Sequence, residues 1–207
     1  MSDNLSKTLR RPRQYWHSDG LPEMAIGGIF LAIGLLFSGQ AVVPEHSPWQ
    51  ALAGLALPIL IVGSLWLTRW LVGAAKARLT YPRTGYVAYP RPSRRRRILT
   101  LLLGAGVGGL LANLLIAANL DTLNFTFPLQ GLFVGLLLAF IGQGLIRFYV
   151  VGGFTALLGI ALAAVAMPEE PGNAVFYGLL GLALVISGGI TLWRYLRQNP
   201  RPEAEKL

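Results

Sequence analysis

The fold depends on residues 127–166, which read FPLQGLFVGLLLAFIGQGLIRFYVVGGFTALLGIALAAVA. This stretch is too long for one membrane-spanning helix, because about 20 apolar residues cross a hydrocarbon core of about 30 Å. Its one charged residue is Arg147. We therefore predict two helices, at residues 127–146 and 150–166, with a tight connector at residues 147–149.

The rest of the chain is equally apolar. Of its 207 residues, 54% are hydrophobic and 13% are charged, and the mean hydropathy is +0.54. A chain of this composition cannot hide its apolar surface in one soluble core, so the sequence predicts an integral membrane protein. It has no cysteine, which excludes disulfides, thiolate nucleophiles and sulfur-ligated metals.

Apolar runs of sufficient length predict an all-α bundle of six transmembrane helices. Their predicted bounds are 22–43, 49–72, 98–120, 127–146, 150–166 and 174–196. The first 21 residues form an N-terminal segment, residues 22–196 form the transmembrane domain with one longer loop at 73–97, and residues 197–207 form a C-terminal tail. The connectors 44–48, 121–126, 147–149 and 167–173 are short, so consecutive helices should be antiparallel neighbours.

The basic residues predict the orientation. All 18 Lys and Arg residues fall before the first helix, in the 73–97 loop and its flanks, at the fourth connector or after the last helix. By the positive-inside rule, both termini and that loop are then cytoplasmic. We expect a multi-pass protein of the cell membrane, and an odd number of helices would break this segregation of charge.

The 73–97 loop carries the densest charge. Pro82-Arg-Thr-Gly85 has turn chemistry between short segments rich in β-formers, which indicates a small β-hairpin at the membrane surface. The basic run just before the third span could hold anionic lipid headgroups as well as fix the topology. The residues expected to contact headgroups are Arg91, Arg94, Arg95, Arg96 and Arg97.

Few polar or ionisable side chains are predicted inside the spans. No Asp, Glu, Lys, Arg or His is predicted at mid-membrane, which disfavours a proton-coupled pump, a voltage sensor or an intramembrane protease. Asn113 and Gln130 are predicted near the outer side and Gln143 near the inner side. We expect two separate interhelical groups of hydrogen bonds, one with Asn113 and Gln130 and the other with Gln143, Ser64 and Thr68.

Small residues indicate close helix packing. Gly28 with Ala32, Gly34 with Ser38, and Gly131 with Gly135 have the four-residue spacing that lets helices approach. Residues 104–109, GAGVGG, match a dinucleotide-binding pattern, but the alternating strands and helices that this pattern requires are missing. We interpret that motif too as a packing face.

The residues ahead of the first span predict how that helix starts. Ser18 or Asp19 could cap it, and Pro22 suits its first turn. Glu23 is the one acidic residue close to the inner end of a span, and we expect it to be a helix-start charge stabilised by the helix dipole.

The sequence does not identify a function. The expected role is that of a noncatalytic accessory or scaffold subunit or a homo-oligomer; the alternative is a small transporter component or the membrane substrate-binding subunit of a permease. An enzyme acting on lipids would lack an obvious general base. We expect no cofactor. We also expect no metal, because His17 and His46 are predicted on opposite sides of the membrane and cannot share one. The expected partners are the lipid bilayer, anionic headgroups and another membrane protein, but no nucleic acid.

Overall fold

A computed structural model describes residues 18–44, 47–84, 126–142 and 145–200 of the chain. This part is helical and contains no strand, so the all-α prediction is confirmed there. The helices are α2 (Leu21–Val42), α3 (Pro48–Leu79), α4 (Tyr81–Thr84), α6 (Thr126–Gly142), α7 (Ile146–Ala164) and α8 (Glu169–Gln198).

Four of these helices, α2, α3, α7 and α8, are long and apolar enough to cross a membrane. They correspond to the predicted spans at 22–43, 49–72, 150–166 and 174–196. The span predicted at 127–146 corresponds to α6, a shorter apolar helix, and the span at 98–120 lies outside the described residues. Large apolar side chains are exposed along the bundle, among them Leu35, Trp66 and Phe140, as a lipid solvent allows.

The predicted start of the long loop, at residue 73, is wrong. Helix α3 continues to Leu79, and the Thr80 amide still donates to the Lys76 carbonyl at 3.0 Å before α4 begins. The hairpin prediction therefore fails for residues 76–84, while residues 85–97 lie outside the described residues. Alanine, lysine and arginine in the stretch 74–78 are strong helix formers, which explains why the helix extends beyond its apolar part.

Two predicted connectors are also partly helical. Helix α7 begins at Ile146, so Arg147 lies in its first turn rather than in a connector at 147–149. Helix α8 begins at Glu169, within the connector predicted at 167–173. Pro171 is tolerated there because the amides of a first turn have no partner inside the helix, and Glu169 and Glu170 favour a helix start.

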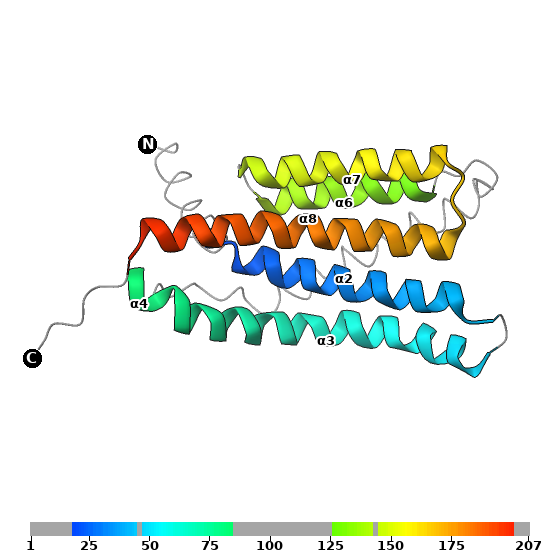
Figure 1. The fold of residues 1–207 in the computed structure, drawn as a ribbon, viewed down its shortest axis with the longest axis horizontal. Coiled ribbons are helices and arrows are strands. Elements are labelled where there is room, and N and C mark those ends of the chain that lie inside the picture. The colour runs from blue at the N-terminus through cyan, green and yellow to red at the C-terminus, as the bar shows by residue number, and fades with distance from the viewer. Residues whose placement is uncertain (1–17, 45–46, 85–125, 143–144, 201–207) are drawn as a thin grey trace, which may run out of the picture.

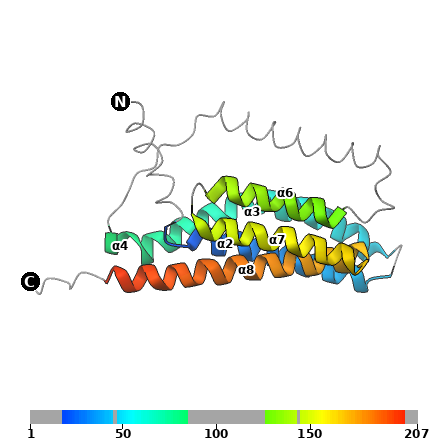
Figure 2. The ribbon, with the colours of Figure 1, turned by 90° about the horizontal axis from the view of Figure 1, so that it is seen from above.

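The helices lie in layers (Figure 1). α2 and α8 pack antiparallel at the centre, the α6–α7 hairpin lies along one side of α8, and α3 lies along the opposite side of α2. The view in Figure 2, turned by 90°, shows the same helices running nearly parallel to one long axis. Helices distant in sequence, α2 and α8, thus form the most extensive contact.

Glycines set the spacing within each helix pair. A methyl group at position 27 would lie 2.8 Å from the Gly181 carbonyl oxygen, and one at position 34 would lie 2.7 Å from the Gly178 nitrogen. Between α6 and α7, a methyl group at position 152 would lie 2.7 Å from the Gly135 carbonyl oxygen. Backbone therefore meets backbone within the α2–α8 pair and within the α6–α7 pair, as in small-residue packing in membranes.

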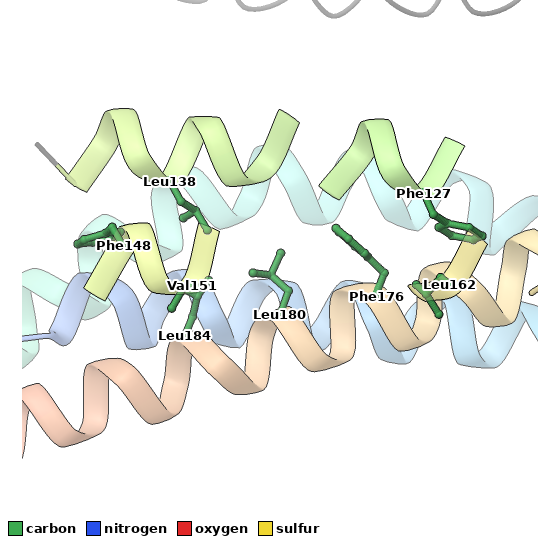
Figure 3. Packing of buried hydrophobic residues seen from close by; sticks show 8 residues of the cluster. All are labelled: Phe127, Leu138, Phe148, Val151, Leu162, Phe176, Leu180 and Leu184. Atoms are coloured by element: carbon green, nitrogen blue, oxygen red, sulfur yellow. The ribbon is translucent and has the colours of Figure 1, made fainter. Parts of the chain in front are cut away.

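Larger side chains fill the space between the two pairs. Figure 3 shows this core cluster, which α6, α7 and α8 all contribute to. Phe176 and Leu180 of α8 are fully buried at its centre. The cluster consists of Phe127, Leu138, Phe148, Val151, Leu162, Phe176, Leu180 and Leu184.

Candidate functional site

The two ends of the bundle differ in charge. We call the end where α2 and α7 begin and α3 and α8 finish the basic end, because the exposed arginines of the described residues lie toward it. These are Arg69, Arg78, Arg194 and Arg197. The opposite end exposes Glu169 and Glu170 at the start of α8, and we call it the acidic end.

The first half of a buried charge cluster forms where the chain enters α2. Gly20 adopts φ 73°, a left-handed conformation that glycine reaches without strain, and it turns Asp19 into the bundle. One Asp19 oxygen lies 2.9 Å from Lys76 Nζ of α3, and their side chains are 1% and 2% exposed. The Thr80 hydroxyl donates to the same carboxylate at 3.3 Å, and so does the Leu21 amide.

The second half lies one turn further along α2. Glu23, whose side chain is 1% exposed, pairs with Arg147 of α7 at 2.6 Å, and Ser187 of α8 donates to its other oxygen at 3.2 Å. Arg147 also donates to the Thr191 hydroxyl at 3.2 Å, and Thr191 in turn donates to the Ser187 carbonyl at 2.8 Å. One carboxylate therefore joins α2, α7 and α8.

Arg83 closes the same end from α4. Its guanidinium donates to the carbonyl oxygens of Leu196 at 3.1 Å and Asn199 at 2.8 Å. The last carbonyls of a helix lack partners within the helix and carry partial negative charge, so a cation there satisfies both needs. This contact ties the C-terminal end of α8 to α4, which lies within the stretch predicted as a loop.

Within the cluster, each buried carboxylate faces a cation from another helix. Desolvation makes such pairs weak net stabilisers, but removing one partner leaves an uncompensated buried charge and costs about 3–5 kcal/mol. The arrangement is suited to holding helix ends in register. The described residues contain no group of three or more His, Cys, Asp or Glu that could hold a metal ion.

Of the sequence-predicted site residues, the structure describes Gln130. It lies in α6 near the acidic end, where its amide donates to the Asn173 side-chain oxygen of α8 at 3.4 Å. Asn113 and Gln143 lie outside the described residues, as do Arg91, Arg94, Arg95, Arg96 and Arg97. The structure thus gives Gln130 an interhelical partner but leaves the other members of the set untested.

Sequence reasoning missed both ion pairs of the cluster. Glu23 was expected to interact with its own helix dipole, yet the structure places it against Arg147, far away in the chain. One signal was available, because both residues were predicted at the same end of their spans. A buried carboxylate and a cation at one depth in a membrane are expected to pair.

Comparison of the chain with protein-family models, with curated proteins and with solved structures finds no match. Its function is therefore inferred from the contacts among its own helices.

Proposed function

We propose that this chain is a noncatalytic membrane protein that acts through helix packing, as an accessory or scaffold subunit or as a homo-oligomer. The observation that carries the proposal is the use of its buried charges. Asp19 and Glu23 are each engaged by a cation and by one hydroxyl group, that of Thr80 or Ser187, an arrangement that holds helices rather than one that activates a substrate.

Helix α3 supports the same proposal. Its apolar side chains are exposed along most of its length in the described structure, including Leu55, Ile59 and Val62. Trp66 and Trp70 are exposed further along. An extended apolar face on a membrane helix can contact lipid or another protein, and packing in membranes needs close shape contact rather than ionisable groups.

The test is native mass spectrometry of the protein extracted gently from its own membrane. We expect either a stoichiometric protein partner or a stable homo-oligomer. A protein that stays monomeric and without a partner at every detergent concentration would refute the packing role.

The proposed topology is six spans in the cell membrane with both termini and the basic end in the cytoplasm. The exposed arginines at that end support it, because positive charge is retained on the cytoplasmic side. A cysteine introduced at Arg194 should react with a membrane-impermeant thiol reagent in inverted vesicles and not in intact cells. A cysteine at Glu170 should do the opposite.

We further propose that anionic lipid headgroups contact the basic end. Both carboxylates at that end are buried and neutralised, so its exposed charge in the described residues is positive. Each such charge near an anionic surface contributes about 1 kcal/mol. R194Q/R197Q should retain fewer phosphatidylglycerol molecules in native mass spectra than the parent protein, and E169Q/E170Q, altered at the acidic end, should retain as many.

A second function, a small transport component, is favoured by the hydrogen bond between Gln130 and Asn173. Amides between spanning helices can bind a neutral polar ligand as well as each other. This function predicts a co-purifying small molecule in the native spectra that disappears in Q130L/N173L. Spectra of the parent protein without any retained small molecule would remove its basis.

A further inference from the structure

The described helices form two closely packed pairs, α2–α8 and α6–α7, joined by an interface of a different kind. Within α2–α8 and within α6–α7, glycine backbones touch, and packed backbones have no rotamers with which to adjust. Between the pairs lies the core cluster of phenylalanine, leucine and valine side chains, which can change rotamers. Relative motion should therefore occur between the two pairs rather than inside them.

The acidic end of this interface is fixed by shape. The Phe127 ring of α6 occupies the space that a side chain at Gly172 of α8 would need, and the Phe127 carbonyl abuts Gly159 of α7. Phe127 is 5% exposed, and the Gln130 to Asn173 hydrogen bond lies one turn away. An aromatic ring seated against the backbone of α8 at Gly172 resists sliding and can serve as a pivot.

The basic end of the interface is held by charge. Arg147 of α7 pairs with Glu23 of α2 and donates to Thr191 of α8. The Arg147 side chain is 22% exposed, whereas that of Glu23 is 1% exposed, so the arginine of the pair reaches the surroundings of the bundle while the carboxylate is buried. A partly exposed arginine can exchange its partner for another, which a packed ring cannot do.

We infer that the α6–α7 hairpin is a hinged element, with its pivot at Phe127 and Gly172 and its latch at Glu23 and Arg147. When the latch is released, the basic end of α7 moves away from α2 and α8 while the acidic end stays in place. This inference goes beyond the packing role, because it assigns the bundle a moving part and names the contact that restrains it.

The absence of native cysteine allows a direct test, since labelling cysteines can be introduced without first removing others. One label pair, at Tyr149 and Ile190, reports on the basic end of α7 and α8; a second pair, at Val165 and Val175, reports on the acidic end. All four positions are exposed. The distances between the two labels of each pair would be measured by double electron–electron resonance in lipid nanodiscs for the parent, E23Q/R147M and R147K.

The latch variant E23Q/R147M should add a longer-distance population at the basic end and leave the acidic-end distances unchanged. R147K, which keeps the positive charge, should retain mostly the parent distances. The matched control is D19N/K76M, which removes the other buried ion pair but does not touch α7, and it should leave both distributions unchanged. Far-UV circular dichroism verifies that helix content is preserved in each variant.

Two results would overturn the inference. The first is a basic-end distribution in E23Q/R147M that matches the parent, because the pair then restrains nothing. The second is an equal change at both ends, because the hairpin then separates as a whole rather than turning about Phe127.

Discussion

At the basic end, side chains of opposite charge join the helices, whereas at the acidic end an aromatic ring and two amides join them. Asp19–Lys76 and Glu23–Arg147 connect α2 to α3 and α7, and Phe127 fits against Gly159 and Gly172 where α6, α7 and α8 meet. Removing one partner of a buried ion pair leaves the other charge uncompensated, which destabilises the fold. Steric fit is lost instead when a side chain no longer matches the space around it. The two ends should therefore fail in different ways.

The largest loss is expected from K76M at the basic end. It leaves the Asp19 carboxylate buried without its cation, which should lower the free energy of unfolding by about 3–5 kcal/mol. Chemical unfolding in mixed micelles, followed by circular dichroism, measures this. The control R78M removes an exposed cation two residues away and should change stability by less than about 1 kcal/mol.

The double variant D19N/K76M sharpens the same point. Replacing both charges removes the uncompensated carboxylate, so stability should recover most of what K76M loses. If the double variant proved no more stable than K76M, an unpaired buried charge would not be the source of the loss.

At the acidic end, G172L should cost about 1–3 kcal/mol, because the new side chain and the Phe127 ring would require the same space. The comparison variant is G189L in the same helix, where an added Cβ atom meets nothing within 4 Å among the described residues. Thermal unfolding of the two proteins in the same detergent provides the measurement. Equal melting temperatures would show that the ring is not locked in place.

A smaller effect is expected from the amide pair. Q130A should lower stability by about 0.6 kcal/mol, the average for a hydrogen bond between membrane helices. A double-mutant cycle with N173A should give a coupling energy of that size. Additive losses would mean that the two amides do not act on each other.

The smallest effect on the protomer is expected from G28L. A Cβ atom added at Gly28 meets nothing within 4 Å in the described structure, and the position is exposed, so unfolding should be unaffected. The variant is informative about assembly instead. If a homo-oligomer seen for the parent protein dissociates in G28L, the small-residue face of α2 lies in the subunit interface; an intact oligomer places the interface elsewhere.

Composition and hydropathy were sufficient to predict helices, and four predicted spans match helices of spanning length. Helix ends were less predictable. Helix α3 extends past its apolar residues through alanine, lysine and arginine, which have high helix propensity but do not mark a membrane span by their hydropathy. The segregation of charge between the ends also follows from sequence, since each basic residue could be placed relative to an apolar run.

Helix pairing was only partly predictable. The close packing predicted for Gly131 and Gly135 is confirmed, as both abut α7. Gly34 is packed but Ser38 is exposed, and Gly28 faces away from the other described helices. The main contact on α2 uses Gly20, Gly27 and Gly34, seven residues apart, so a search for the four-residue spacing missed its period. Nothing within one helix reveals which distant helix its glycines meet.

The contact between α2 and α8 has a consequence for how the protein is made. Among the described helices α2 is synthesised first and α8 last, with more than 120 residues between them. Because the ribosome adds about 5–20 residues per second, many seconds pass between the synthesis of α2 and that of α8. During that interval the faces of Gly27 and Gly34 and the carboxylate of Glu23 lack their native neighbours. Insertion factors that shield newly made helices should therefore associate longest with α2.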